Sequence, residues 1–585
     1  MPNNLLRQPN FAALVALVWL LVALGLLLQH WANTADTLLD TDDAMRLVEM
    51  RAWLAGHGWF DMHEARVQPP LGYDTHWSRL VDVGLAGLFT IFKLFDPQSA
   101  ERLMRAWWPL LWLLPTIAGM VMISWRVAGR EGAMVSLLLA MVGVPAYQQF
   151  MPGRIDHHNV QIALTMLATA ATVWADRKRW AGVAAGAISG LALSIGLESA
   201  PYLAMCGVAL GFRQVTSWSF SPTLREYGLA LAGGAAAAFL VSVPPGRWME
   251  SHCDAIAINN VAAVIVGGLV LAIAGLARHH ERLNRVAAIA GAGCAALAVF
   301  VLFEPRCVHG PFAMVDPEIW PVWHSYVREM QPLMAVFRVN PLTASAIAAF
   351  PAAALLAALA LIGDPERRRD YGFLAAAGVF LAAAITTFAA IRGFSYAMWL
   401  GMPLVAAAAL QLFAALKLKN RLARLMVALL MTPLAISSGA IAVAYGNGLN
   451  DTDPFARPAS RQCFRTESYG PLATLPPGLV VTDISFGPFL LALTPHSVMA
   501  APYHRLGPGI VTAHRALASP PAQAREILTD ADVDYVMICG PRPPDGLFEP
   551  ARGQSLWGRL QAGQTPDWLT RLPGDGPFAV YQVRP

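Results

Sequence analysis

The stretch "MPGRIDHHNVQIAL", from Met151 to Leu164, places an acid and two imidazoles between two long apolar runs. Charged groups beside a bilayer cost free energy, and those that persist there usually serve a function. What Asp156, His157 and His158 can do therefore depends on which side of a membrane they face. It also depends on which other polar groups lie on that side.

Composition places the chain among proteins that cross a membrane many times. It has 585 residues, of which 56% are hydrophobic and 14% charged, and its mean hydropathy is +0.47. Soluble domains carry about 25% charged residues. The net charge of +4 is small and spread over short loops, which argues against nucleic-acid binding. The sequence contains no Walker A loop, no dinucleotide glycine fingerprint and no CxxC pair.

Apolar runs long enough to span a bilayer recur along residues 1–445, and about thirteen spans are expected. They lie near 11–29, 103–125, 131–149, 159–175, 180–197, 201–214, 226–243, 260–277, 286–303, 343–362, 371–391, 394–413 and 424–444. The first run lacks a convincing small-residue cleavage site and is predicted to be a retained helix. A shorter run at 81–95 is predicted to be an interfacial helix within a long outer loop, 30–100.

Basic loops support this topology. Lys and Arg gather at 126–131, 176–179, 278–285, 366–369 and 417–424. If 81–95 does not span, all five loops and the N-terminus fall on one side, which the positive-inside rule makes cytoplasmic. The outer face is then expected in the periplasm of a bacterial inner membrane, and it carries the loop 304–342 and the tail 446–585. Strand-like runs between Pro and Gly turns predict a small α/β domain in that tail.

Cysteine usage fits the same sidedness. Cys253 and Cys307 lie in two outer loops, and Cys463 and Cys539 lie in the tail. An oxidising compartment favours disulfides between Cys253 and Cys307 and between Cys463 and Cys539. The alternative is four free thiols.

Acidic residues gather at three places on the expected outer face. They are Asp40, Asp42 and Asp43 in "LLDTDDAM", Asp156 beside His157 and His158, and Glu329 in "SYVREMQP". A hard divalent cation such as Mg²⁺ or Mn²⁺ takes oxygen ligands from several chain segments, so these loops could converge on one ion. Each motif also has a plainer interpretation. Helix caps would explain the first two, a solvated loop acid the third, and snorkelling to the head groups would explain Arg392 in "IRGFSYAM".

The order of these elements resembles the STT3-type oligosaccharyltransferases (eukaryotic STT3, archaeal AglB and bacterial PglB) of the GT-C membrane glycosyltransferase superfamily. "GRIDHHN" resembles the family's second acidic motif in its archaeal form, and "SYVREMQP" resembles its SVSE-type loop. "IRGFSYAMWLGMPL" resembles the segment whose arginine contacts the donor phosphates. The resemblance covers roughly residues 1–445. It implies a GT-C fold with thirteen spans and an external C-terminal domain.

The resemblance also implies roles for individual residues. Asp43 matches the catalytic aspartate of the first loop, with Asp42 as the alternative register. Asp156, His158 and Glu329 match the other metal-binding positions, and Arg392 matches the phosphate-binding arginine. The implied cofactor is Mg²⁺ or Mn²⁺, and the implied donor is a sugar or oligosaccharide on polyprenyl phosphate or diphosphate. Glu198, in "SIGLESAPY", is a second candidate catalytic carboxylate, with a helix-terminal polar residue as the plainer reading.

The chain departs from that family in its tail, where the WWDYG motif that recognises the Ser or Thr of a glycosylation sequon is missing. The acceptor therefore stays open between a protein and a lipid, a lipopolysaccharide or a surface polysaccharide. Possible acceptor or auxiliary contacts are His157 and the "PYHR" residues Tyr503, His504 and Arg505, with a structural turn as the alternative for "PYHR". A transporter would place its ionisable residues inside the spans, so the loops of this chain argue against one.

Aromatic residues in the first outer loop are expected to form a membrane-interface belt. They are Trp59, Phe60, Tyr73 and Trp77. A sugar-binding role is the alternative interpretation.

Overall fold

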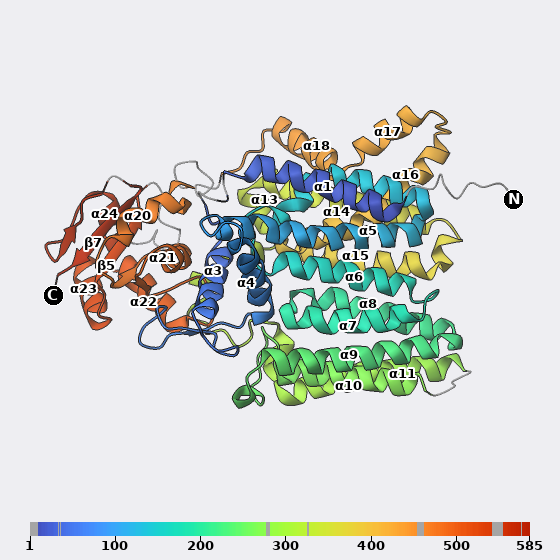
Figure 1. The fold of residues 1–585 in the computed structure, drawn as a ribbon, viewed down its shortest axis with the longest axis horizontal. Helices are drawn as coiled ribbons and strands as arrows, with labels where there is room; N and C mark the ends of the chain where they lie inside the picture. The colour runs from blue at the N-terminus through green and yellow to red at the C-terminus, as the bar shows by residue number, and fades with distance from the viewer. Residues whose placement is uncertain are drawn as a thin grey trace.

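A computed structural model describes residues 10–32, 34, 37–276, 281–324, 327–452, 461–540, 554–574 and 576–584. Long apolar helices lie side by side as a bundle, and a smaller domain with a β-sheet lies beyond one end of it (Figure 1). Two further helices, α3 (Thr41–Leu54) and α4 (Arg79–Lys93), lie between the bundle and this domain (Figure 1). The architecture is the predicted one, a helical membrane bundle with a small C-terminal α/β sheet domain.

The bundle consists of α1 (Phe11–His30), α5 (Ala100–Met141), α6 (His158–Trp174), α7 (Trp180–Ile195), α8 (Ala200–Thr216), α9 (Ser221–Ser242), α10 (Ile258–Ala274), α11 (Arg282–Phe303), α14 (Pro341–Ile362), α15 (Tyr371–Ala389), α16 (Phe394–Ala415), α17 (Arg421–Leu430) and α18 (Pro433–Gly446). Seven helices within the described ranges are long and apolar enough to cross a membrane. The number is eight if α17 and α18, bent by 54°, form one span. The predicted count of about thirteen is therefore not confirmed, because helices such as α7 and α10 have only 16 and 17 residues.

A break inside α5 reverses the chain. Gly129 has φ 67°, a left-handed conformation that favours glycine. Before the break, Arg102 donates to the carbonyl of Trp31 at the end of α1 that carries the first outer loop. After it, the chain returns to the same end, where Gly153 N donates to Arg105 O at 2.9 Å. The loop that carries "GRIDHH" is thereby set beside the first outer loop.

The helices α3 and α4 lie across the end of the bundle rather than alongside its members (Figure 1). A buried ion pair joins them, because Arg46 of α3 lies 2.8 Å from the carboxylate of Asp82 in α4, which also pairs with Arg79 of its own helix at 3.1 Å. The apolar run expected at 81–95 is thus α4, which is not among the candidate membrane spans of the described residues.

The smaller domain contains a five-stranded sheet of order β4-β3-β5-β7-β6. Its strands are β3 (Leu479–Val481), β4 (Ser497–Val498), β5 (Tyr535–Cys539), β6 (Leu569–Arg571) and β7 (Phe578–Val583). Strand β3 is parallel to β4 and β5, whereas β7 is antiparallel to β5 and β6. The main helices of this domain are α20 (Gly470–Ala473), α21 (Gly487–Leu493), α22 (Gly507–Ala518), α23 (Pro521–Asp530) and α24 (Leu556–Gln561). A second, two-stranded sheet pairs β1 (His63–Glu64) with β2 (Tyr73–Asp74) in the first outer loop.

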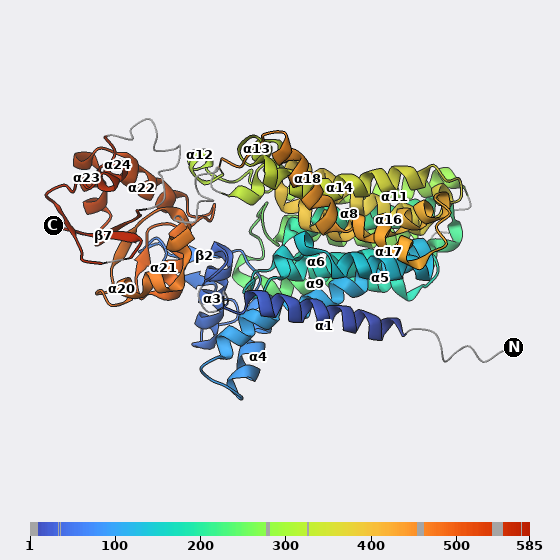
Figure 2. The same cartoon turned by 90° about the horizontal axis from the view of Figure 1, so that it is seen from above.

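The first outer loop binds the edge of the larger sheet. Val498 N donates to Arg66 O and Gln68 N donates to Val498 O, both at 2.8 Å. A single hydrophobic core continues from α3 and α4 into this domain; it includes Val48, Leu85 and Val498. Figure 2 shows α3 and β2 lying next to α21 from a second direction. The sheet domain and the first loop therefore pack as one unit over the end of the bundle.

The opposite end of the bundle carries the basic loops. Arg126 Nη2 lies 2.9 Å from Asp176 and 2.8 Å from Asp370, so the loops after the first part of α5, after α6 and before α15 meet there. Residues 278–280 of a fifth predicted basic loop lie outside the described residues. Acidic and basic loops thus occupy opposite ends of the bundle, as the charge pattern predicts.

Candidate functional site

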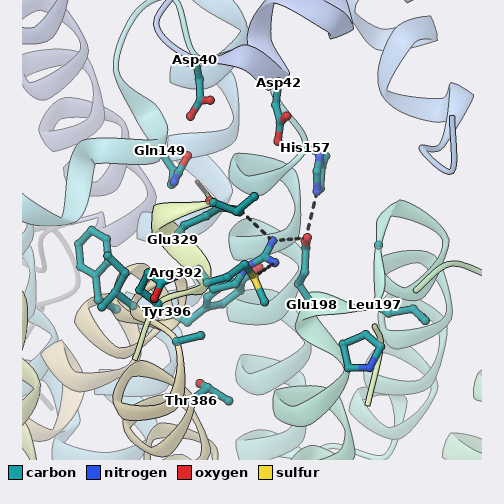
Figure 3. Close-up of a pocket in the computed structure, with 18 of the residues that line it drawn as sticks. Asp40, Asp42, Gln149, His157, Leu197, Glu198, Glu329, Thr386, Arg392 and Tyr396 are labelled. Atoms are coloured by element: carbon teal, nitrogen blue, oxygen red, sulfur yellow. Dashed lines mark hydrogen bonds and ion pairs between the residues drawn. The ribbon is translucent and has the colours of Figure 1, made fainter. Parts of the chain in front are cut away.

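A cavity of about 2070 Å³ lies where the bundle, α3 and the sheet domain meet. Part of its lining is apolar and comes from the bundle helices, including Ala200, Val264 and Ile347. The rest is polar and lies at the end of the bundle that carries the acidic loops. Figure 3 shows Asp42, His157, Glu198, Glu329 and Arg392 directed toward the same space.

Junctions between helices supply these polar groups. Asp156 and His157 precede α6, and Glu198 lies in the short 3₁₀ turn η3 (Leu197–Ser199) between α7 and α8. Glu329 lies in η7 (Arg328–Met330), which follows α12 (Trp320–Trp323) and precedes α13 (Leu333–Val339). Arg392 lies in η9 (Ile391–Gly393) before α16. Polar backbone and side chains are tolerated at such junctions because they lie outside the continuous apolar helices.

A glycine allows η9 to sit tightly against the end of α15. A Cβ atom on Gly393 would lie 2.6 Å from the backbone nitrogen of Thr387, which no larger residue could avoid without a shift. The same turn, η9, is also held against the loop that carries Glu329, because Ile391 N donates to Gln331 O at 3.0 Å. Arg392 and Glu329 are therefore presented together.

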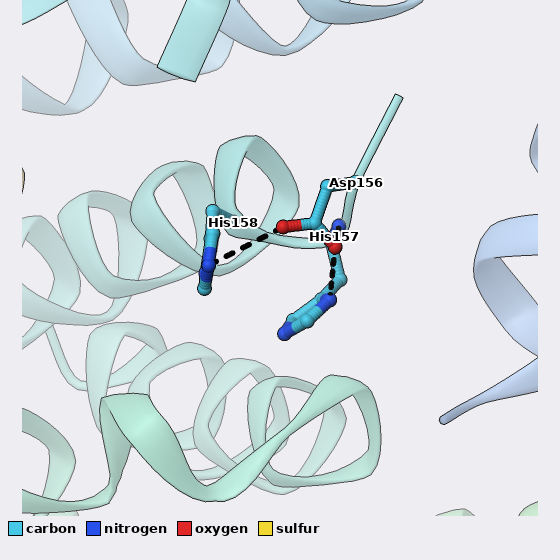
Figure 4. A group of neighbouring side chains, drawn as sticks. All are labelled: Asp156, His157 and His158. Atoms are coloured by element: carbon cyan, nitrogen blue, oxygen red, sulfur yellow. Dashed lines mark hydrogen bonds and ion pairs between the residues drawn. The ribbon is translucent and has the colours of Figure 1, made fainter. Parts of the chain in front are cut away.

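Asp156 lies between two imidazoles at the start of α6 (Figure 4). Its Oδ1 contacts His157 Nδ1, and its Oδ2 lies 3.3 Å from His158 Nε2. All three side chains are buried, and each offers a ligand atom within 4.8 Å of the others. Asp156 Oδ2 accepts no hydrogen bond from the residues that the structure describes. A buried carboxylate oxygen without a donor, beside two imidazole nitrogens, suits a divalent cation.

The loops predicted to converge do converge on this cluster. Glu198 Oε2 lies 3.2 Å from His157 Nε2, and Glu329 Oε2 lies 3.6 Å from His158 Nε2. Arg392 bonds to Glu198, and its Nη2 lies 3.6 Å from Glu329 Oε1. The candidate residues Glu198, Glu329, Arg392 and the two histidines thus form one connected network. We call it, together with Asp156, the acid–imidazole cluster.

The first acidic motif enters the cavity through Asp42, whereas Asp43 faces the "GRID" loop. Asp43 Oδ1 accepts hydrogen bonds from the backbone nitrogens of Ile155 (2.8 Å) and Asp156 (3.0 Å). Its Oδ2 lies 2.9 Å from Arg154 Nη1. Asp42 lines the cavity and Asp43 does not. Of the two registers expected from the sequence, the structure turns Asp42 rather than Asp43 toward the cavity, because consecutive residues at the start of a helix point about 100° apart.

The pKa values of Asp42 and His157 are shifted by the burial and the close spacing of the carboxylates around them. Burial raises the pKa of Asp42 well above its usual value, and the charges of Asp156, Asp40 and Glu329 raise it further. Burial alone would lower the pKa of His157, but Asp156 and Glu198 raise it to about 10. Without another cation, the cluster thus needs protons and arginines to balance its negative charge.

A second wall of the cavity carries Tyr503 and His504 of "PYHR", and Arg505 lies just behind them. His504 Nε2 lies 2.7 Å from Asp254 Oδ2, and Arg505 donates to both oxygens of Asp254 at 2.9 and 2.8 Å. Burial would raise the pKa of Asp254, but the hydrogen bonds from His504 and Arg505 hold it well below its usual range. Tyr503 OH donates to Thr41 O at 3.2 Å, next to Asp42.

Both expected cysteine pairs are joined in the structure. Cys253 bonds Cys307, which ties together two outer loops that line the cavity, and Cys463 bonds Cys539 in the sheet domain.

Some participating residues were not singled out from the sequence. Arg154 pairs with Asp40 and Asp43, and it stands two residues before Asp156 in the quoted motif, where its charge was a usable signal. Asp254 and His76 carried no signal, because they meet His504 only through packing of distant loops. The interface belt expected for Tyr73 and Trp77 is wrong. Both rings are buried, since Tyr503 stacks on Tyr73 and packs edge-on against Trp77.

No family model matches the chain, and no curated protein matches it. Solved structures do match. The archaeal oligosaccharyltransferase AglB from Archaeoglobus fulgidus, in complex with an inhibitory peptide and a dolichol-phosphate, has a TM-score of 0.60 at 16% identity, covering 90% of this chain and 69% of that chain. The chain therefore has the fold of this oligosaccharyltransferase.

Two further structures of the Archaeoglobus fulgidus oligosaccharyltransferase agree. The form tethered to an acceptor peptide with the NVT sequon has a TM-score of 0.62 at 16% identity, covering 97% of this chain and 73% of that chain. The complex with Zn and sulfate has a TM-score of 0.57 at 15% identity, covering 98% of this chain and 73% of that chain. Together with its apolar helices, this likeness identifies the chain as a multi-pass membrane protein with an STT3-like GT-C fold.

Proposed function

We propose that the chain is a membrane glycosyltransferase, which transfers a sugar or oligosaccharide from a polyprenyl phosphate or diphosphate to an acceptor. The observation that carries the proposal is the acid–imidazole cluster, built from junctions of separate helices at one end of a cavity whose lining along the bundle helices is apolar. A lipid-borne phosphate needs both environments. The AglB complex, which has the same fold, contains a dolichol-phosphate, a lipid-borne phosphate of this chemistry.

Arg392 is suited to the donor phosphate. Breaking a glycosyl–phosphate bond leaves negative charge on the departing oxygen, and a fixed guanidinium facing that oxygen lowers the barrier. Glu198 and Glu329 both contact Arg392 Nη2, so the guanidinium is oriented before the donor arrives. The lipid chain would lie along the apolar part of the cavity.

A divalent cation, Mg²⁺ or Mn²⁺, fits the cluster. The residues that would hold it are Asp42, Asp156, His158 and Glu329, and when bound it would supply further positive charge beside the donor phosphate. The complex of the archaeal enzyme with Zn and sulfate supports a site of this chemistry in the fold. Asp43 and Arg154 would act indirectly, because they fix the loop that presents Asp156.

Residues 1–445 would form the transmembrane glycosyltransferase module and 446–585 an external domain. Two disulfides and the acidic loops lie at one end of the bundle, and the basic loops lie at the other. The positive-inside rule therefore favours a cluster that faces the periplasm of a bacterial inner membrane.

The test is donor cleavage by purified protein. Wild type would be incubated with radiolabelled sugars on polyprenyl phosphate and on polyprenyl diphosphate, with Mn²⁺, with Mg²⁺ or with EDTA. We expect metal-dependent release of sugar from one donor class, and a loss of about 10²-fold or more in Asp156→Asn. Asp316→Asn, an exposed acid outside the cavity, is the matched control. If Asp156→Asn cleaves donor at the wild-type rate, the site assignment is wrong.

A further inference from the structure

The second wall of the cavity has a composition that the donor does not require. Phe312, Trp323, Trp77 and Tyr503 supply aromatic surface, and His504 and Asp254 supply polar groups. The ring of His504 lies 5.3 Å from that of Phe312 and 5.2 Å from that of Trp323. These residues come from the first outer loop, two later loops and the sheet domain. We call this set the aromatic wall.

The aromatic wall adjoins the acid–imidazole cluster. The ring of Trp77 lies 5.8 Å from that of His157. Tyr503 reaches the backbone of Thr41, one residue before Asp42. A molecule held against this wall is therefore next to the carboxylates and to the donor phosphate position.

We propose, on the basis of the function proposed above, that the aromatic wall binds the acceptor and that this acceptor is a saccharide, which reacts through a hydroxyl group. Sugar rings present apolar C–H faces, which pack on aromatic rings, and hydroxyl groups, which bond carboxylates and imidazoles. His76 Nδ1 is buried beside the wall and has no hydrogen-bond partner among the described residues. Such a group is costly unless a ligand pairs with it.

A peptide acceptor fits this wall less well. Peptides commonly bind by adding a strand to a free sheet edge. The edge nearest the wall is β4, which leads directly into Tyr503, and Arg66 and Gln68 already occupy its hydrogen-bonding groups. The wall therefore offers side chains rather than open backbone.

His504 is placed to accept the hydroxyl proton. Its Nε2 is held by Asp254, which orients the imidazole, and its Nδ1 has no partner among the residues described. The acceptor oxygen would attack the anomeric carbon, forming the new C–O bond as the bond from that carbon to the phosphate oxygen breaks. The proton would pass to His504, and the electron pair would leave with the polyprenyl phosphate or diphosphate, whose charge Arg392 faces. The disulfide between Cys253 and Cys307 holds the loops of Asp254 and Phe312 together.

The test combines binding and transfer on full-length protein in nanodiscs. Calorimetry would measure three probes: methyl glycosides of glucose, galactose and N-acetylglucosamine; lipopolysaccharide in phosphatidylglycerol vesicles; and a hexapeptide containing Asn-Val-Thr. We expect binding of a saccharide probe and none of the peptide. Binding of free glycosides would indicate a glycan acceptor, and binding of lipopolysaccharide alone a glycolipid acceptor; both support the proposal.

Variants separate binding from chemistry. Phe312→Ala should raise the saccharide Kd about 2- to 10-fold. His504→Gln should lower saccharide transfer about 10²-fold, a far larger change than its effect on that Kd. His309→Gln, an exposed histidine just outside the cavity, should change none of these.

Three results would overturn the inference: peptide binding without saccharide binding, no saccharide binding by wild type, or normal transfer by His504→Gln. Failure of the proposed function is a separate outcome. It would be seen as no donor cleavage in wild type, whereas calorimetry would still report whether saccharides bind.

Discussion

Exchanging Asp42 and Asp43 for asparagine, one at a time, tests the site most directly. The two acids are neighbours in sequence, yet the structure gives them opposite surroundings. Asp43 is fully buried and pairs with Arg154 and two backbone amides. Asp42 faces the cavity among other carboxylates. The two variants should therefore fail in different assays.

Asp43→Asn should destabilise the protein. Removing one partner of a buried ion pair costs about 3–5 kcal/mol, and the lower end applies because Arg154 keeps Asp40 at 2.8 Å. With an unfolding entropy of about 2.1 cal/mol/K for each of the 585 residues, a loss of about 3 kcal/mol corresponds to a fall in Tm of roughly 2–3 °C. Asp42→Asn should leave the Tm in EDTA within about 1 °C, because burial and the neighbouring carboxylates already disfavour the charged form and an amide replaces a protonated acid with little change.

Addition of Mn²⁺ should narrow the difference in Tm between the two variants. A cation at 100 times its Kd stabilises the folded state by about 2.7 kcal/mol, so wild type should gain a few degrees in Tm. Asp42→Asn should lose this gain and about 10²-fold or more of donor cleavage, whereas Asp43→Asn should keep part of both. Differential scanning fluorimetry measures the Tm of each variant in EDTA and in MnCl₂, and the cleavage assay measures its activity. An Asp43→Asn protein with wild-type Tm and no activity, together with an active Asp42→Asn protein, would refute the reasoning.

Three further predictions concern the surroundings of the site. Burial, with help from Asp82, raises the pKa of Glu49 to about 8, so the stability that this group contributes is present below pH 4.5 and is lost as the pH rises through 8. The Tm of wild type should fall between about pH 5 and 8, and Glu49→Gln should flatten that fall; an equally steep fall in the variant contradicts it. Arg392→Lys keeps the positive charge but loses the planar guanidinium that can donate two hydrogen bonds to a phosphate. We expect donor cleavage to drop about tenfold or more; cleavage at the wild-type rate would contradict this. Joint replacement of Cys253 and Cys307 by serine should lower stability by about 4 kcal/mol, given the 54-residue separation, and non-reducing peptide mapping of wild type should find the pair joined.

The sequence alone predicted the properties that depend on local composition, namely hydropathy and the charge of each loop. Hydropathy predicts membrane helices because a bilayer leaves no partner for unpaired backbone groups. The alternation of basic and acidic loops predicts which loops share an end, and Asp156 does meet Glu198 and Glu329 through the two histidines. The number of spans was less secure, because several bundle helices are shorter than a straight span and α17 and α18 are bent.

Direction and contact were decided only by the tertiary structure. Asp42 and Asp43 are adjacent and chemically identical in the sequence. Only the orientation of the first turn of α3 directs Asp42 to the cavity and Asp43 to the "GRID" loop. The pairing of His504 with Asp254, 250 residues apart, depends on how the sheet domain packs on the outer loops. Composition and periodicity depend only on residues that are close in sequence, and they predict helices and their ends. A functional site depends on the positions of side chains from distant segments. Those positions exist only once distant segments have packed against one another.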